Sequence, residues 1–428
     1  MATVVLVGTL DTKGEEYGWL RERLIDGGVD VVVVDTGVVG RPRFAADVPR
    51  EEVARAAGTD PAALRAQGDR GTAVTAMARG AAEAVARLYA SGRLHCVLAI
   101  GGSGGTSIAT RAMRGLPLGV PKLMVSSMAA GNVSPYVGTT DITMMYSVVD
   151  IAGINSVSAP VFANAADAAV GMAKGFAAGR RALGPADLAA GERPVVATSM
   201  AGVTTPGVDA ARARLTELGY EVLVFHVSGA GGRTLESLAG QGLFAGVLDL
   251  TLSELADDLT GGILSAGPDR LTAAGHHGVP QVVSLGALDM LKFGPPDTLP
   301  AAMRDRHVLV HNPSITVVRT TAEECAELGR RVAAKLRAAA GPAEGCVPLR
   351  GLSTLGGPGG PYHDPAADAA LFGALREGLR GSAVTVTGLR GSAVTVTDID
   401  ADINDASFGR AAADRMHRMI MQRPAVRT

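Results

Sequence analysis

Aromatic residues are scarce in this chain: they make up 4% of its 428 residues, and Trp19 is the single tryptophan. Proteins that bind single-stranded nucleic acid stack the bases on exposed aromatic rings along a basic groove. The formal net charge is −2, and the 40 lysines and arginines are scattered along the chain, so the sequence offers no basic footprint for a phosphate backbone. We therefore expect no nucleic-acid partner.

Cysteines are also few, and Cys96, Cys325 and Cys346 show no paired spacing. Without paired spacing, the cysteines indicate neither a disulfide framework nor a cysteine-rich zinc site. The remaining candidates for a zinc site lack the required spacing as well: His276, His277, His307 and His311. We expect a cytoplasmic protein, with no metal site built from its side chains alone.

Long hydrophobic runs are missing too. The N-terminus reaches Asp11 after one short apolar run, which is too brief for the core of a signal peptide and far too brief for a membrane span. We interpret this run as a first β-strand, and we expect no membrane partner.

The sequence does contain β-branched runs at residues 4–8, 29–35 and 96–102, separated by helical patterns at 15–24 and 73–88. Continuous apolar runs of this length are typical of strands buried on both faces of a parallel sheet. Strands that alternate with helices predict a doubly wound, Rossmann-like α/β domain.

A second domain follows a stretch rich in proline, glycine and small residues at 183–194, where we expect the boundary. The predicted domains are 1–185 and 194–428, each an α/β Rossmann-like domain with a mostly parallel sheet flanked by helices, and the C-terminal tail is expected to pack on the second. The elements predicted there are strands at 194–200, 221–227, 245–250, 279–286 and 307–311, helices at 206–218 and 234–240, and a helix with a capping box at Thr321 and Glu324.

A tandem copy interrupts the C-terminal part: GLRGSAVTVT at 378–387 recurs unchanged at 388–397. Two copies of a decapeptide are too few for a solenoid. We expect the extra copy to loop out or to form an edge strand.

The first glycine-flanked loop, residues 8–14, follows a strand and precedes a helix. Backbone amides at a helix N-terminus bind anions, and a lysine adds charge. The loop matches neither a P-loop nor a GxGxxG fingerprint, so an ordinary strand-to-helix turn remains an equal alternative. Its candidate phosphate-binding residues are Thr9, Asp11, Thr12 and Lys13.

The second loop gives the stronger signal, because four glycines within five residues let a backbone approach a ligand closely. It consists of Gly101, Gly102, Ser103, Gly104, Gly105 and Thr106. Asp35 ends the second strand, where an acid commonly reaches a ribose hydroxyl, although a turn aspartate fits equally well. Gly131 and Asn132 are candidates by position alone.

A similar loop in the second domain places Gly231, Gly232 and Arg233 between a strand and a helix. Its amides and guanidinium predict a site for a small anionic substrate. Nearby carboxylates are available for Mg²⁺ or for acid–base chemistry, although a solvated helix face explains most of them as well: Glu254, Asp257, Asp258 and Asp289.

No nucleophile motif is present, so three functions stay open at this point. The chain is a nucleotide-dependent enzyme acting on a small anion, a nucleotide-sensing interaction module without catalysis, or a hinged binder of small molecules that uses no nucleotide.

Five segments together resemble one family: GTLDTKGEE (8–16), GGSGGTS (101–107), SPYVGTTDITMMYSVVDIAGIN (134–155), HVSGAGGRT (226–234) and GALDMLKF (286–293). This is the ATP-binding family of the tomato mosaic virus resistance protein. The resemblance extends through almost the whole chain. This sequence departs from the family pattern at the tandem copy and at Ala130, where the family usually has serine.

The resemblance implies two Rossmann-like subdomains, ATP bound mainly by the first, Mg²⁺ accompanying the phosphates, and a homodimer. The family's nucleotide-binding residues correspond here to Thr9, Asp11, Thr12 and Lys13 and to Gly101 through Thr106. The plant member continues into a barrel domain, so the resemblance also implies a separate barrel-type partner protein for this chain.

Overall fold

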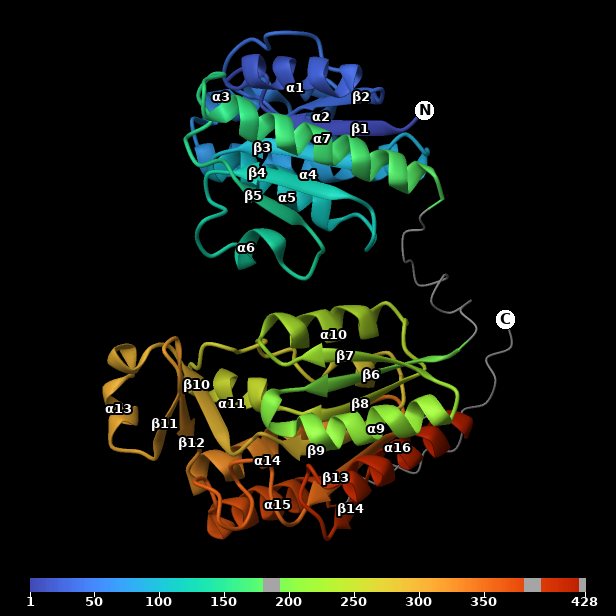
Figure 1. The fold of residues 1–428 in the computed structure, drawn as a ribbon, viewed down its shortest axis with the longest axis vertical. Helices are drawn as coiled ribbons and strands as arrows, with labels where there is room; N and C mark the ends of the chain where they lie inside the picture. The colour runs from blue at the N-terminus through green and yellow to red at the C-terminus, as the bar shows by residue number, and fades with distance from the viewer. Residues whose placement is uncertain (180–192, 381–393, 423–428) are drawn as a thin grey trace. The chain divides into compact units, whose positions relative to one another are not determined.

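The structure of the protein, a computed structural model, describes residues 1–179, 193–380 and 394–422 (Figure 1). The chain divides into two compact units, Met1–Gly184 and Pro185–Thr428. Most of the stretch expected to hold the domain boundary, and most of the tandem copy, lie outside the described residues. In the described parts of the chain, no helix is long and apolar enough to cross a membrane.

The first unit is built on one parallel sheet in the order β2-β1-β3-β4-β5. The three β-branched runs form its first three strands, as predicted. The strand bounds are β1 (Thr3–Gly8), β2 (Asp30–Asp35), β3 (Cys96–Gly101), β4 (Lys122–Ser126) and β5 (Thr143–Tyr146).

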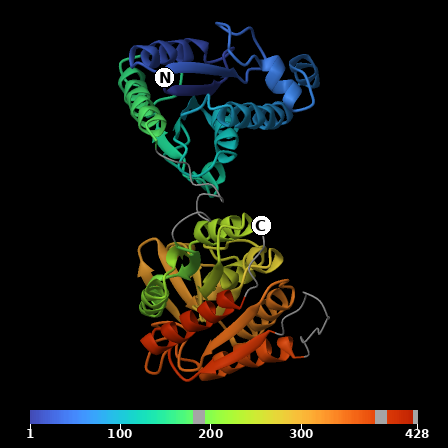
Figure 2. The ribbon, with the colours of Figure 1, turned by 90° about the vertical axis from the view of Figure 1, so that its right-hand side faces the viewer.

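Helices cover both faces of this sheet (Figure 2). Helices α1 (Gly14–Asp26) and α7 (Ser158–Ala177) pack with Val4 and Leu6 on one face. The other face carries Val5 and Val7. It is covered by α2 (Arg50–Ala56), α4 (Arg70–Ala90) and α5 (Ser103–Arg114). Two further helices of this unit, α3 (Pro61–Gln67) and α6 (Ser134–Val137), are short. Alternate residues of one strand thus enter two cores, which is why the whole run is apolar.

The second unit has a six-stranded parallel sheet in the order β14-β13-β9-β8-β6-β7. Its strands are β6 (Val195–Met200), β7 (Glu221–His226), β8 (Gly246–Thr251), β9 (Gln281–Gly286), β13 (Ala343–Pro348) and β14 (Thr395–Ile399). The first four match predicted strands. The last two come from the region that we expected to be a tail, which is therefore an integral part of the sheet.

The helices of the second unit also form two layers. On one face lie α9 (Thr205–Glu217) and α16 (Ala406–Met421). The other face is covered by α11 (Ser253–Thr260), α14 (Ala322–Arg337) and α15 (Pro365–Leu379), while α10 (Ala230–Gly240) and α12 (Ala273–His276) contact each other. The predicted capping box starts α14: Thr321 accepts from the Glu324 amide at 3.2 Å, and Glu324 from the Thr321 amide at 2.8 Å.

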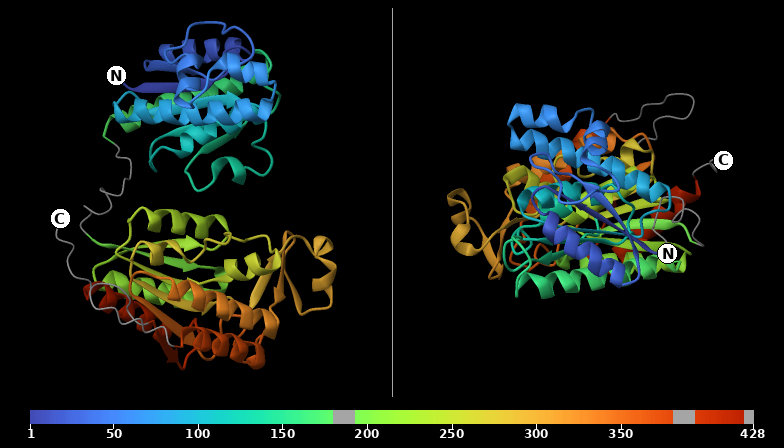
Figure 3. Two further views of the ribbon diagram at one scale, coloured as in Figure 1. Left: turned by 180° about the vertical axis from the view of Figure 1, so that it is seen from behind. Right: turned by 90° about the horizontal axis from the view of Figure 1, so that it is seen from above.

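A small antiparallel sheet, β10-β12-β11, extends the second unit as an arm (Figure 3). Its strands are β10 (Met290–Phe293), β11 (Val308–Asn312) and β12 (Ile315–Arg319), and α13 (Ala301–Arg304) precedes β11. The predicted strand at 307–311 thus belongs to this arm and not to the parallel sheet.

Candidate functional site

A cavity of about 940 Å³ opens in the first unit at the carboxyl ends of β1 and β3. In the order β2-β1-β3-β4-β5 these two strands flank the point where the strand order reverses, and open α/β sheets bind ligands at that point. Both predicted loops contribute to its wall: Thr9, Asp11, Thr12, Lys13, Gly101, Gly102, Ser103, Gly104 and Gly105.

The glycine-rich loop joins β3 directly to α5. No side chain caps the N-terminus of α5, so its first-turn amides are free to bind an anion. A Cβ atom on Gly101 would lie 2.9 Å from the Gly105 Cα atom, which shows how closely this backbone turns on itself. Thr106 sits behind the loop: its buried hydroxyl donates to the Gly102 carbonyl at 2.8 Å and contacts the Ser126 hydroxyl at 2.6 Å.

The loop after β1 is held by its own contacts. The hydroxyls of Thr9 and Thr12 lie 2.7 Å apart, and the Lys13 ammonium donates to the Ile151 carbonyl. Asp11 Oδ2 accepts from the Val39 and Gly40 amides at 2.8 and 3.1 Å, so Asp11 ties the segment after β2 to this loop. Its Oδ1 atom is buried and has no hydrogen-bond partner among the described residues.

Asp35 does not line the cavity. Its Oδ1 atom accepts from the Leu10 and Gly37 amides at 3.0 and 2.8 Å, and Oδ2 accepts from Arg50 Nε at 2.8 Å. Of the two interpretations of Asp35, this geometry fits the turn aspartate and leaves no oxygen free for a ribose.

The loop after β4 also differs from expectation, because Ser127 and Met128 line the cavity while Gly131 and Asn132 do not. Asn132 Oδ1 accepts from the Ser134 amide at 3.0 Å, which is a local turn contact. The structure thus places Ser127 and Met128 in the wall of this cavity, and Gly131 and Asn132 outside it.

The opposite wall of the cavity was not predicted from the sequence. It comes from α3, α4 and the segment after β2, and it is apolar with charged groups at the junction of α3 and α4: Val38, Leu64, Val74, Met77, Arg65, Asp69 and Arg70. Asp69 caps α4 by accepting from the Gly71 amide at 2.9 Å. An N-cap aspartate before a helix is a readable signal, but it does not indicate that the helix faces a ligand.

In the second unit the predicted anion loop already holds an anion, the carboxylate of Glu254. Glu254 Oε1 accepts from the Gly229 and Gly232 amides at 2.7 and 3.0 Å, and a Cβ atom on Gly232 would collide with this carboxylate. Gly231 lies in the same turn, and Arg233 donates to the Ser265 carbonyl at 3.0 Å. The structure therefore does not support the expectation that Gly231, Gly232 and Arg233 bind a substrate.

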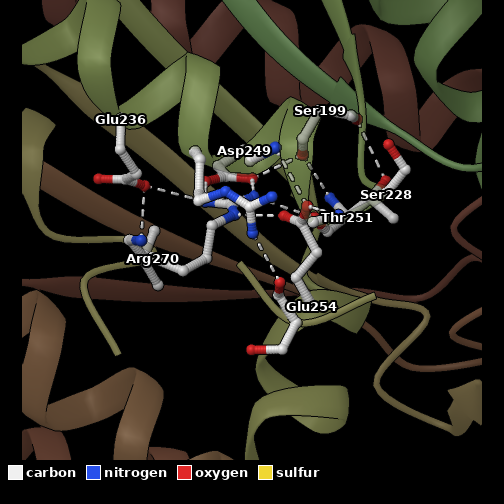
Figure 4. A network of polar contacts seen from close by, with 12 residues as sticks. Ser199, Ser228, Glu236, Asp249, Thr251, Glu254 and Arg270 are labelled. Carbon is white, nitrogen blue, oxygen red and sulfur yellow. Dashed lines mark hydrogen bonds and ion pairs between the residues drawn. The ribbon is translucent and has the colours of Figure 1, made fainter. Parts of the chain in front are cut away.

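Glu254 belongs to a buried network centred on Arg270, which has no solvent exposure (Figure 4). The guanidinium donates to Glu254 Oε2 at 2.7 Å and to Asp249 Oδ1 at 2.7 Å, and it contacts Glu236 Oε1 at 3.3 Å. Burial alone lowers the pKa of Arg270, but the charges of Asp249, Glu254 and Glu236 raise it well above its ordinary value. Ser199 on β6 donates to Asp249 Oδ1 at 2.6 Å, so the network joins β6 and β8 where the strand order of this sheet reverses.

The carboxylates near this network are mostly not on a solvated helix face, as one interpretation of the sequence had it. Glu254, Asp257 and Asp289 are fully buried. Asp258 is partly exposed and accepts from the Ser265 hydroxyl at 3.0 Å. Among the described residues, no group of three or more His, Cys, Asp or Glu side chains could hold a metal ion.

The two domains of one protein family match the chain. Residues 2–178 match the N-terminal domain, and residues 193–420 the C-terminal domain, of the family described as Uncharacterised protein family (UPF0261). A UPF0261 protein of Clostridium tetani is 41% identical over 417 residues, covering 97% of this chain and 98% of the relative. Another from Rhizobium meliloti is 43% identical over 413 residues, covering 96% and 98%.

The ToMV resistance protein Tm-1(GCR237) of Solanum lycopersicum is 34% identical over 426 residues, which cover 96% of this chain and 55% of the tomato protein. This chain thus spans about half of that relative. Among solved structures, S. aureus MnaA with UDP is similar at 10% identity over 66% of this chain and 79% of that one, with a TM-score of 0.22. A TM-score this low carries no argument about function.

Proposed function

The chain belongs to the Uncharacterised protein family UPF0261, and for this member we propose that the first unit binds ATP, with Mg²⁺, in the cavity between β1 and β3. One observation carries the proposal. Two loops that were chosen from the sequence as phosphate-binding candidates line the same cavity, at the point of the sheet where this fold class binds nucleotides.

The phosphate groups belong at the glycine-rich side of the cavity. The first-turn amides of α5 carry the positive end of the helix dipole and have no side-chain cap. Lys13 and Arg70 line the same cavity and add two positive charges. The Lys13 ammonium would exchange its bond to the Ile151 carbonyl for a stronger, charge-assisted bond to phosphate.

The nucleoside belongs at the opposite, apolar wall, where Leu64, Val74 and Met77 provide a surface for a base. A volume of about 940 Å³ falls within the range of roughly 300 to 1,000 Å³ found for small-molecule sites. The cavity is therefore large enough for a nucleotide.

Mg²⁺ fits this site as an ion held mainly by phosphate oxygens. Mg²⁺ usually takes one or two protein carboxylates and completes its shell with phosphates and water. Asp11 and Asp150 line the cavity and would supply these carboxylates. Asp11 Oδ2 lies 3.6 Å from Arg50 Nη1, and Asp11 Oδ1 has no hydrogen-bond partner among the described residues. Bound there, the ion would neutralise charge on the phosphates.

Three further properties belong to the proposal. A homodimer and a separate barrel-type partner protein rest on the family resemblance alone, and a cytoplasmic location rests on the absence of paired cysteine spacing. The small anionic substrate loses its support in the second unit, because Glu254 occupies the loop that was expected to bind it.

Calorimetric titration of ATP with Mg²⁺ tests the proposal on three proteins: the wild type, Gly104→Leu and Gly171→Leu. A Cβ atom on Gly104 lies 3.5 Å from Arg70 and 3.7 Å from Val74, so a leucine there enters the cavity. Gly171 is the matched control, because it is an exposed helical glycine with no atom within 4 Å of its Cβ position. We expect binding by the wild type and by Gly171→Leu, and a loss of about tenfold or more in Gly104→Leu.

No binding by the wild type, or equal binding by Gly104→Leu, would overturn the proposal. Repeating the titration with EDTA tests the metal, and we expect weaker binding without Mg²⁺. Release of phosphate from bound ATP would distinguish a nucleotide-dependent enzyme from a sensor.

A further inference from the structure

The end of β2 carries a hydroxyl that the phosphate and base positions described above leave unused. Thr36 follows Asp35, the last residue of β2, and its amide donates to the Gly8 carbonyl at 2.8 Å. This bond continues the pairing of β1 with β2, so Thr36 keeps the geometry of a strand residue beside the loop that begins at Gly8. Thr36 is buried and lines the cavity of the first unit.

The alternation of side chains along β2 explains why Thr36 reaches the cavity and Asp35 does not. Successive side chains of a strand point to opposite faces of the sheet. Val32 and Val34 belong to the core on the face covered by α4 and α5, and Thr36 is the next residue with the same parity. The pattern continues beyond the strand, because Val38 lines the cavity as well.

Contacts with Asp11 and Arg50 fix the backbone on both sides of Thr36. Asp35 Oδ2 accepts from Arg50 Nε at 2.8 Å. A Cβ atom on Gly37 would lie 2.6 Å from Asp11 Oδ1 and 2.7 Å from Arg50 Nη2, so this glycine packs directly against the ion pair. The Thr36 side chain is therefore held in place before any ligand binds, which reduces the entropy cost of binding.

The Thr36 hydroxyl is buried and has no hydrogen-bond partner among the described residues. Other buried threonines beside the cavity are paired: the Thr106 hydroxyl donates to the Gly102 carbonyl at 2.8 Å, and the Thr110 hydroxyl donates to the Thr106 carbonyl at 2.7 Å. Leaving a buried hydroxyl unpaired is costly. A partner that enters from the cavity would remove this cost.

The position of the unpaired oxygens in the first unit also points to a ligand. In the described part of this unit, two buried side-chain oxygens lack a partner, Asp11 Oδ1 and Thr36 Oγ1, and both residues line the cavity. The proposed function assigns Asp11 to Mg²⁺, which leaves Thr36 without a role. Four other buried hydroxyls without a partner all lie in the second unit: Thr198, Ser253, Ser284 and Thr316.

Thr36 lies between the two ends of the proposed nucleotide. Its bond to Gly8 places it beside the loop of residues 8–14, where the phosphates belong. Val38, two residues further along the chain, belongs to the apolar wall at which the base is placed. The sugar of a nucleotide joins the phosphates to the base, and in doubly wound folds a side chain at the end of the second strand contacts a ribose hydroxyl.

On the basis of the proposed function, we propose that Thr36 binds a ribose hydroxyl and makes the site selective for ribonucleotides. A hydroxyl is both a donor and an acceptor, so Thr36 and a ribose hydroxyl satisfy each other without any charge. A sugar that lacks both the 2′- and the 3′-hydroxyl would leave Thr36 unpaired. Sites that bind a substrate hydroxyl in this way reject analogues without it.

Calorimetric titration of ATP and of 2′,3′-dideoxy-ATP, each with Mg²⁺, tests this inference. We expect the wild type to bind ATP about tenfold more tightly than the dideoxy analogue. Thr36→Val removes the hydroxyl and keeps the shape of the side chain, so it should bind the two nucleotides within about twofold of each other. Thr36→Ser keeps the hydroxyl and should keep the preference for ATP.

The matched control is Thr3→Val, which removes another buried threonine hydroxyl from the same sheet. Thr3 begins β1, at the end of the strand opposite to the cavity. This variant should show the wild-type preference for ATP. Circular dichroism checks that each variant is folded.

Two results would overturn the inference while leaving ATP binding in place. One is a wild type that binds ATP and the dideoxy analogue equally. The other is a folded Thr36→Val variant that keeps the wild-type preference. Absence of ATP binding by the wild type would instead overturn the proposed function, and this inference with it.

Discussion

Three residues other than glycine have positive φ in the described parts of the chain: Val148, Leu271 and Ala287. Each lies within two residues of a charged side chain with a specific place in the structure: Asp150 in the cavity wall, Arg270 in its network and Asp289, whose buried carboxylate accepts from the Ser353 hydroxyl. Strain of this kind is tolerated only where neighbouring contacts enforce it. The backbone is thus strained at three of the places where charge is concentrated.

Glu254 acts as a built-in anion, and its removal should be reversible by an added one. Glu254→Ala leaves two amides and one side of the Arg270 guanidinium unpaired, which should cost about 3–5 kcal/mol of stability. Formate fits the vacated position and supplies the same oxygens. We expect formate to raise the melting temperature of Glu254→Ala more than that of the wild type.

Glu323→Ala, which removes an exposed glutamate from the first turn of α14, is the control, and its response to formate should match that of the wild type. Equal formate responses in all three proteins would show that the Glu254 carboxylate is not held as an anion.

Asp289 should make stability depend on pH. Burial raises its pKa to about 6, whereas the unfolded chain has the ordinary value of about 3.9. Because the folded pKa is higher, the stabilising contribution of the protonated form is complete below about pH 4 and is lost as the pH rises through about 6. Asp289→Asn does not titrate, so it should gain about 2–3 kcal/mol relative to the wild type across this window.

Urea unfolding at a series of pH values measures this difference. A difference between Asp289→Asn and the wild type that stays constant with pH would show that the carboxyl has an ordinary pKa.

At the scale of elements, the tandem copy allows a clean deletion. Because residues 378–387 and 388–397 are identical, removing 388–397 leaves an identical residue for every position of α15 and β14. The connection between Arg380 and Val394 shortens from 13 residues to three, which is within the usual length of two to six for such connections. We expect the deletion variant to fold and to bind nucleotide as the wild type does, measured by circular dichroism and calorimetry.

The elements that could be predicted from the sequence are those with a local signal. The apolar runs at 4–8 and 96–102 predicted β1 and β3. The glycines of 101–105 predicted a backbone that turns tightly before a helix. The arm was harder to predict from the sequence. Its short strands, such as β10 and β12, are held by their pairing with each other, which leaves little local signal. The C-terminal tail belongs to the second unit, as expected, and β14 is an edge strand that begins within the second tandem copy. Strand β13 was not predicted.

The candidate site could be predicted from one side only. Loops that leave neighbouring strands meet at one edge of a parallel sheet, so Thr9–Lys13 and Gly101–Gly105 were found together. The wall formed by α3 and α4 is set by helix packing, which no local pattern encodes. The loop at Gly229–Gly232 does have an anion-binding backbone, but its anion is Glu254, more than twenty residues further along the chain.

At the scale of the whole molecule, the two units share one strand order around the first strand of each: β2-β1-β3 in the first and β7-β6-β8 in the second. In the first unit the corresponding edge opens into a cavity. In the second, the Arg270 network occupies it. Among the described residues, the Arg270 network of the second unit thus occupies the position at which the first unit has a cavity.

The most direct test of this account is backbone hydrogen–deuterium exchange of the full chain with and without ATP and Mg²⁺. The account predicts that nucleotide slows exchange at residues 9–14 and 101–107. Exchange at residues 229–233 should remain unchanged, because the amides of Gly229 and Gly232 donate to Glu254. Protection centred on 229–233, or binding without protection of the 101–107 loop, would contradict the assignment of the nucleotide to the first unit.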